Sequence, residues 1–191
     1  FNVARFASQF PIPKDLSAAP NNLCVGDRWI LSEFAEVLET VENYWQSIDI
    51  FSASRTIKNF STDVLPSHWI EMAKGRLYDG DENAAWTIHR IVKDTLTIFS
   101  PVCPFFTHHL SETLYGESAV DVRQYPSSLF PNDDEAVRLR SLTVPLCDFN
   151  SETWRAKKDA SLSLNAEISS ITIPTELSEF SDELTAMHKL C

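Results

Sequence analysis

The adjacent histidines His108 and His109, with Glu112 one helical turn later, are residue types that bind zinc in proteins. A zinc site needs three or four ligands that converge on one ion, and the sequence offers no second group of histidines and cysteines to complete this one. Neighbouring side chains on a helix also point about 100° apart, so the two rings do not readily face one ion. We therefore predict that the chain holds no metal.

The sequence carries none of the common catalytic or phosphate-binding motifs, such as G-x-G-x-x-G, a Walker loop, G-x-S-x-G or H-E-x-x-H. The four cysteines, Cys24, Cys103, Cys147 and Cys191, lie far apart, which is typical of free thiols in a reducing cytosol. We predict that the chain has no catalytic residue and needs no cofactor of its own. A small acidic enzyme with an unrecognised site stays a weak alternative, because no motif supports it.

Composition narrows the class of protein further. The 191 residues are 43% apolar, which is enough for a core, and only four are glycine, which favours helices over strands. A net charge of -11 excludes a generally basic coat for nucleic acid, but not a local basic patch. The sequence contains no uncharged stretch of about 18 apolar residues, so it predicts no membrane span. The chain has no initiator methionine and no leader, so we interpret it as a monomeric, cytoplasmic piece of a longer protein.

Apolar residues repeat at helical spacing through the first 116 residues. The clearest helix begins near Asp27, which we expect as its N-cap, and a second helical stretch covers residues 51–77, where Pro66 predicts a kink or break. Further helices are expected after Asp81 and from Pro101 to Gly116. The residues predicted to be largely buried are Trp29, Ile30, Phe34, Val37, Val41, Ile57, Trp69, Ile88, Ile91, Leu96, Phe99 and Phe106.

These elements predict a mainly α fold, an antiparallel helical bundle followed by a small α+β appendage. We place the domain boundary in the stretch 117–132, which contains Pro126 and Pro131 and has no helical period, and divide the chain into residues 1–126 and 127–191. The appendage is expected to contain a β-favouring run at Ile168, Ile171 and Ile173, followed by a helix that starts at Pro174.

Read in chain order, several segments resemble the helical domain of valyl-tRNA synthetases. Residues 2–6 look like its N-x-x-R-F element, and D-R-W-I-L-S at 27–32 matches the start of a long helix shared by valyl, isoleucyl and leucyl enzymes. Residues 67–76 are similar to its W-Y/I-E-x-x-K-x-R segment, and residues 100–106 to H-P-x-x-P-F, with serine in place of histidine. W-R-A-K-K-D-A-S-L-S-L at 154–164 resembles a lysine-rich segment of the archaeal-type valyl enzymes.

The resemblance implies the anticodon-binding domain of a class I aminoacyl-tRNA synthetase with its C-terminal extension, which positions tRNA(Val) for ATP-dependent aminoacylation. The family motifs H-I-G-H and K-M-S-K-S are absent, so the catalytic core, with its ATP and magnesium, is expected elsewhere in the parent chain. Glu71 and Lys74, where isoleucyl enzymes are arginine-rich, favour the valyl family. An isoleucyl enzyme and an acidic helical scaffold that docks protein partners stay as alternatives.

The resemblance also implies a binding site. Asn2, Arg5 and Phe6 match the element that contacts the anticodon, where an aromatic ring can stack on an unpaired base. Spacing alone favours Phe6 as a core residue on one helical ridge with Phe10, and the resemblance shifts the balance toward the anticodon contact. Lys157 and Lys158 are candidates for contacts to the RNA backbone, the alternative being a solvated pair of charges.

Overall fold

A computed structural model describes residues 1–118, 120–130, 133–169 and 171–191, and all the regular secondary structure in these ranges is helical. In chain order the helices are α1 (Asn2–Ala7), α2 (Val25–Gln46), α3 (Ile50–Asn59), the π-helix η1 (Phe60–Ile70), α4 (Glu71–Tyr78), α5 (Glu82–Phe99), α6 (Pro104–Tyr115), the 3-10 helix η2 (Val120–Val122), α7 (Asp134–Ser141), α8 (Thr143–Asp159), the 3-10 helix η3 (Thr175–Phe180) and α9 (Ser181–His188). The prediction of a mainly α fold is confirmed.

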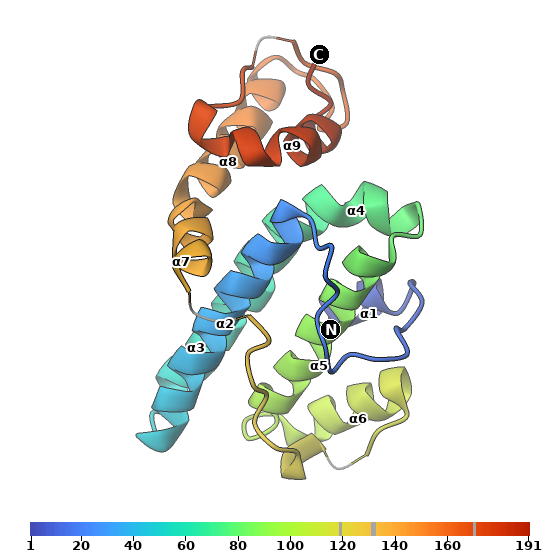
Figure 1. The fold of residues 1–191 in the computed structure, drawn as a ribbon, viewed down its shortest axis with the longest axis vertical. Helices are drawn as coiled ribbons and strands as arrows, with labels where there is room; N and C mark the ends of the chain where they lie inside the picture. Colours follow the sequence, from blue (N-terminus) through green and yellow to red (C-terminus); the bar gives the residue numbers. More distant parts are fainter. Residues whose placement is uncertain (119, 131–132, 170) are drawn as a thin grey trace.

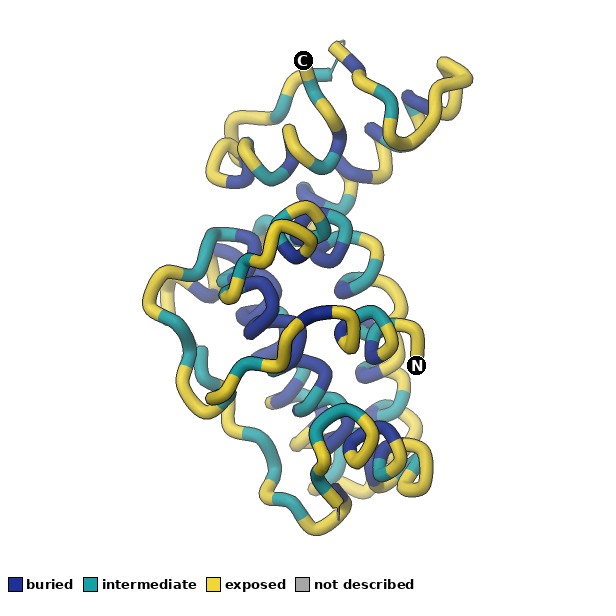
Figure 2. The backbone as a smooth tube through the Cα atoms, turned by 90° about the vertical axis from the view of Figure 1, so that its right-hand side faces the viewer, coloured by how far each residue is buried: buried dark blue, intermediate teal, exposed yellow. Residues whose placement is uncertain are grey.

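The helices α2 and α3 lie side by side as a long hairpin, and α5 packs against both (Figure 1). The short helix α1 lies on α5, α6 crosses near the far end of α5, and α7, α8 and α9 follow at the opposite end of the molecule. Buried residues lie on the inner faces of these helices, and exposed residues lie on the outer faces and loops (Figure 2). The amphipathic spacing of the sequence therefore determines which face of each helix packs inward.

Most of the predicted core residues are buried, Trp29, Ile30, Val41, Trp69, Ile88 and Ile91 among them. Val37 and Phe99 are half-buried. The prediction that Phe106 is largely buried is wrong, because this residue is 40% exposed. The physical reason is the position of the helix start: α6 begins at Pro104 and not at Pro101, so Phe106 lies in the first turn.

The helical stretch around Pro66 continues without a break. Residues Phe60–Ile70 form a π-helix between α3 and α4, and Pro66 lies inside it. Proline lacks the N–H of an ordinary helical hydrogen bond, and a π segment is one way in which a helix accommodates such a defect. Pro66 therefore widens the helix locally where the sequence predicted a kink or a break.

The appendage is not an α+β unit in the part of the chain that the structure describes. Ile168 and Leu190 form one isolated parallel bridge, and no strand includes Ile171 or Ile173. Both of these isoleucines pack against the hydrophobic core instead, and Pro174 follows directly as the N-cap of η3. The run is β-favouring in composition, but no strand in the described ranges lies beside it to pair with. The domain boundary at 126/127 stays a prediction, and Pro131 lies outside the described residues.

A buried carboxylate joins α2 to α4. Asp27 is fully buried, and Arg76 donates to it twice, from Nη2 to Oδ1 at 2.7 Å and from Nη1 to Oδ2 at 2.9 Å. The indole N–H of Trp69 donates to the same Oδ1 at 3.2 Å. The expectation that Asp27 caps its helix is wrong: Cys24 occupies the N-cap, and the carboxylate of Asp27 is used for this tertiary contact.

The helix α9 reaches the same cluster through Glu183. Its Oε2 accepts from the backbone N–H of Gly26 at 3.1 Å, and its Oε1 accepts from the thiol of Cys24 at 3.2 Å. The N-cap residue Cys24 makes no side-chain capping hydrogen bond, and Glu183 thus supplies a carboxylate acceptor to the N-terminus of α2 from another helix. Gly26 permits this approach, because a Cβ at that position would lie 2.4 Å from Glu183 Oε1.

Asp27→Ala should lower the free energy of unfolding by about 3–5 kcal/mol, because it leaves the Arg76 guanidinium without its buried partner. Lys74→Ala is the matched control, since it breaks the half-exposed ion pair with Glu71 and should cost less than about 1 kcal/mol. Urea unfolding followed by circular dichroism measures both. Equal effects of the two substitutions would show that the Asp27 cluster has no special role in stability.

Candidate nucleic-acid interface

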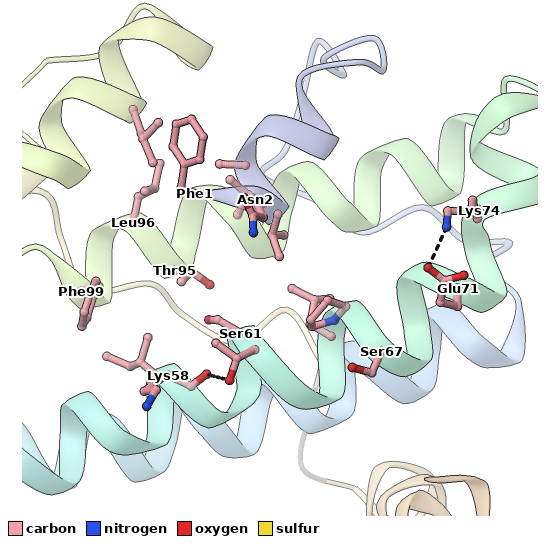
Figure 3. Close-up of a pocket in the computed structure, with 18 of the residues that line it drawn as sticks. Phe1, Asn2, Lys58, Ser61, Ser67, Glu71, Lys74, Thr95, Leu96 and Phe99 are labelled. Atoms are coloured by element: carbon pink, nitrogen blue, oxygen red, sulfur yellow. Dashed lines mark hydrogen bonds and ion pairs between the residues drawn. The ribbon is translucent and has the colours of Figure 1, made fainter. Parts of the chain in front are cut away.

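A cleft of about 1000 Å³ opens between the start of α1, the end of α3 with η1, and the middle of α5. In Figure 3, Asn2 and Thr95 lie on the side of α1 and α5, while Lys58, Ser61 and Ser67 lie on the opposite side. Its volume is at the upper end of the range for pockets that hold small molecules. The π-helix borders one side of this cleft, so the same segment that accommodates Pro66 also shapes the hollow.

The walls of the cleft combine aromatic rings with a few polar groups. Phe1, Phe99 and Phe106 line it, and the exposed fractions of Phe1 and Phe106 are 68% and 40%. Lys58 lines it too and forms no ion pair with any described residue, whereas Lys74 is paired with Glu71 at 2.7 Å. Exposed rings beside an unpaired ammonium suit a flat, anionic ligand such as an unstacked nucleotide.

The residues predicted to contact the anticodon do not all lie in this cleft. Asn2 lines it, and no described residue forms a hydrogen bond with its side-chain amide. Arg5 is exposed on α1 but does not line the cleft, and Phe6 is half-buried outside it. The role of these three residues in RNA binding stays a prediction.

Phe6 belongs to an aromatic cluster. Its ring meets Phe10 edge to face, with centroids 5.0 Å apart, and Tyr78 at 6.4 Å. Phe10 is anchored in turn, because its carbonyl oxygen lies 3.2 Å from Nε2 of the buried His89. Phe6 therefore has a packing role and is only half-buried, while its stacking on a base stays a prediction.

The prediction that Lys157 contacts the RNA backbone is wrong. Lys157 is fully buried, and its ammonium donates to the carbonyl oxygens of Leu164 at 2.8 Å and His188 at 2.7 Å. Burial and the nearby charge of Lys189 lower the pKa of this ammonium. Lys158, the next residue, is exposed and stays a candidate.

Lys157 is part of a buried polar network that joins the C-terminal helices to the π-helix. Nε2 of His188 lies 2.8 Å from Oδ1 of Asn150, and Nδ2 of Asn150 lies 3.1 Å from Nδ1 of His68. These contacts assign the proton of His188 to Nε2, which donates to Asn150. Nδ1 of His188 is buried and has no hydrogen-bond partner among the described residues, and burial with the charge of Lys157 lowers the pKa of His188 to about 4.

Sequence reasoning missed Lys58 and Asn165, both of which line the cleft. Nothing in their residue types or spacing distinguishes them from other exposed polar residues, because the cleft forms only when distant helices meet.

In the described ranges, no group of three or more His, Cys, Asp or Glu residues is placed to hold a metal ion. No described helix is long and apolar enough to cross a membrane.

Comparison with known proteins places this geometry in context. Residues 27–172 match the family model described as the anticodon-binding domain of tRNA ligase. The valine–tRNA ligase of Aeropyrum pernix is 26% identical over 99% of this chain and 24% of its own length. Those of Methanothrix thermoacetophila and Methanopyrus kandleri are each 30% identical, over 93% and 96% of this chain and 20% and 21% of their own lengths. The chain thus spans about a quarter or less of the curated relatives it matches.

Lys157→Met should lower the free energy of unfolding by about 2–4 kcal/mol, because two buried carbonyl oxygens lose their donor. Lys158→Met is the control, because Lys158 is the next residue and is exposed; it should change the free energy of unfolding by less than about 0.5 kcal/mol. Urea unfolding of both variants makes the comparison direct. A mild effect at both positions would argue against the buried ammonium.

Stability should fall as the pH drops from 7 to 5, by about 2 kcal/mol from His188 alone. The unfolded chain binds this proton below pH about 6.5, while the folded chain resists it until about pH 4, so protons favour the unfolded state between these values. His188→Gln keeps a donor for Asn150 and removes the titration, so its stability should depend less on pH. Unfolding curves at pH 7, 6 and 5 test this, and identical slopes for the two proteins would refute it.

Proposed function

We propose that this chain, which belongs to the family of anticodon-binding domains of tRNA ligases, binds the anticodon arm of tRNA(Val) as part of a valine–tRNA ligase. The observation that supports this most directly is the cleft beside α1. It combines exposed aromatic rings, a free amide on Asn2 and an ammonium on Lys58 without an ion-pair partner among the described residues. Single-stranded RNA loops offer unstacked bases that such a surface binds by stacking and by hydrogen bonds to base edges.

The choice of valine rests on the names of the relatives and on the sequence. The relatives from Aeropyrum pernix, Methanothrix thermoacetophila and Methanopyrus kandleri are valine–tRNA ligases. Valine anticodons end in A-C by the genetic code, so a middle adenine is available for stacking. We assign the open face of the Phe6 cluster, which includes the exposed Tyr78, to this base.

The other predicted residues take separate roles in this proposal. Arg5 is exposed on the same helix and offers a guanidinium to a base edge or the adjoining phosphate. Asn2 faces the cleft and can both donate to and accept from a base. Lys158 is exposed near the end of α8 and provides a charge for the RNA backbone.

The aminoacylation reaction itself belongs, in this proposal, to a catalytic core on the same parent chain. The H-I-G-H and K-M-S-K-S motifs of such a core are absent from these 191 residues, so the core would lie elsewhere in the parent chain. It would bind ATP with magnesium. We propose a cytoplasmic, monomeric protein whose role is to hold the tRNA while the core charges it. The protein-scaffold alternative predicts no affinity for an RNA hairpin.

A fluorescent hairpin RNA with the valine anticodon loop tests the assignment by anisotropy titration with the 191-residue chain. Phe6→Ala should weaken binding by about 1–3 kcal/mol, the range for the loss of one base–aromatic stack. Arg5→Ala should lower the slope of log affinity against log salt by about 0.7 if its partner is a phosphate. The effect of Phe6→Ala should shrink when the middle adenine of the anticodon is replaced, whereas a salt slope set by a phosphate contact should change equally for both hairpins.

Phe51→Ala is the control for Phe6→Ala, because it removes a ring that is 74% exposed at the start of α3. Thermal unfolding of each variant separates lost packing from lost binding. If Phe6→Ala and Arg5→Ala lower stability but leave hairpin affinity unchanged, Phe6 is a packing residue and the anticodon assignment is wrong. Equal affinity for hairpins with valine and isoleucine anticodons would remove the valine assignment.

A further inference from the structure

A second hollow, of about 740 Å³, lies at the end of α8 and along the turn that follows it. We call it the α8 groove. Its lining includes two cations, Arg155 and Lys158, and two hydroxyls, Ser161 and Ser163. Both cations are exposed, and neither forms an ion pair with a described residue.

The charge of the α8 groove differs from that of the chain as a whole. The chain carries a net charge of -11, yet no described Asp or Glu lines this groove. Exposed cations beside hydroxyl donors attract an anion with several oxygen atoms, such as a phosphate diester. The groove therefore suits an anionic backbone better than an apolar or basic partner.

The α8 groove and the cleft share one wall. Trp154 and Leu164 line both hollows, and Leu164 is 56% exposed while Trp154 is half-buried. On the side of the cleft, Asn165 continues this wall, and no described residue forms a hydrogen bond with its side-chain amide. An apolar ridge thus separates a cationic groove from a cleft that holds aromatic rings and amides.

The buried side chain of Lys157 holds the ridge of Trp154 and Leu164 in place. Its ammonium binds the carbonyl oxygen of Leu164, and the backbone N–H of Leu162 donates to the carbonyl of Lys157 at 2.8 Å. The turn between them passes through Ser161, whose φ of 56° lies in the left-handed region. A turn with these constraints keeps Leu164 and Asn165 at one position relative to α8.

We propose that this ridge is a crossing point for single-stranded RNA, with a phosphate in the α8 groove at Arg155 and Lys158 and the attached base in the cleft beside Asn165. The ridge suits RNA because phosphate and base project from different positions on one sugar, and the two hollows adjoin at Trp154 and Leu164, which line both. The proposal rests on the proposed function and assigns part of the RNA site to the C-terminal segment 154–165. In this arrangement Lys157 is a positioning residue and does not touch the RNA.

The test uses the 191-residue chain and the same fluorescent hairpin RNA, titrated at several salt concentrations. Arg155→Ala/Lys158→Ala should weaken binding at least tenfold in 0.1 M salt and lower the salt slope by about 1.4, which is two phosphate contacts on a single strand. Lys14→Ala/Arg55→Ala is the matched control, because both cations are exposed, line neither hollow and change the net charge equally. The control should weaken binding less than threefold.

Asn165→Ala gives a second, independent readout. It should weaken binding of the hairpin several-fold without changing the salt slope, since an amide that reads a base edge carries no charge. If the two double variants behave alike and Asn165→Ala has no effect, the ridge proposal is wrong while anticodon binding stands. A wild-type chain that does not bind the hairpin overturns both proposals, and tighter binding of a phosphorylated peptide than of the hairpin replaces RNA as the occupant of the groove.

Discussion

The arrangement of the helices depends on the ion pair between the guanidinium of Arg76 and the buried carboxylate of Asp27. A carboxylate that is fully removed from water, as that of Asp27 is, needs charged or N–H partners, and Arg76 supplies two hydrogen bonds to it. The same guanidinium lies 3.0 Å from Asp81 and 3.4 Å from Glu183. Burial acts to lower the pKa of Arg76, but its bonds to Asp27 and the surrounding negative charge raise it above its usual value. One side chain therefore connects the start of α2, the start of α5 and α9.

This connection extends from the charged cluster to the candidate RNA site. Glu183 holds α9 against the start of α2, and the same helix ends at His188, whose carbonyl oxygen accepts from Lys157. Lys157 also binds the carbonyl of Leu164, and Leu164 forms part of the wall between the cleft and the α8 groove. A change at Glu183, which does not line the cleft, would consequently alter a wall of the cleft from a distance. The C-terminal helices thus complete the surface that the bundle begins.

The sequence predicted the helices and their buried faces well, because each rests on local spacing that a single chain segment contains. It failed where the decisive partner is distant. Asp27 has the composition of an N-cap, but Arg76 and Trp69 lie nearly 50 and just over 40 residues away and use its oxygens for tertiary contacts. Lys157 has the pattern of a solvated charge beside Lys158, and only the folded turn brings two carbonyl oxygens to it. The cleft itself could not be predicted, since it forms between α1, η1 and α5, which are separate in the sequence.

An acidic chain can bind RNA only where its cations are clear of its carboxylates. Arg28, Arg90 and Arg138 each pair with a glutamate or aspartate, so their charges are largely neutralised within the protein. Exposed charges interact over about 10 Å at 0.1 M salt, which means that a local group of unpaired cations acts almost independently of the net charge of the chain. Arg155 and Lys158 form such a group in a groove whose described lining contains no acid, and Lys58 adds a charge inside the cleft. In the proposed complex, the acidic surface elsewhere would repel RNA that approaches in the wrong orientation, so the same charge distribution that limits affinity would direct the loop to these two hollows.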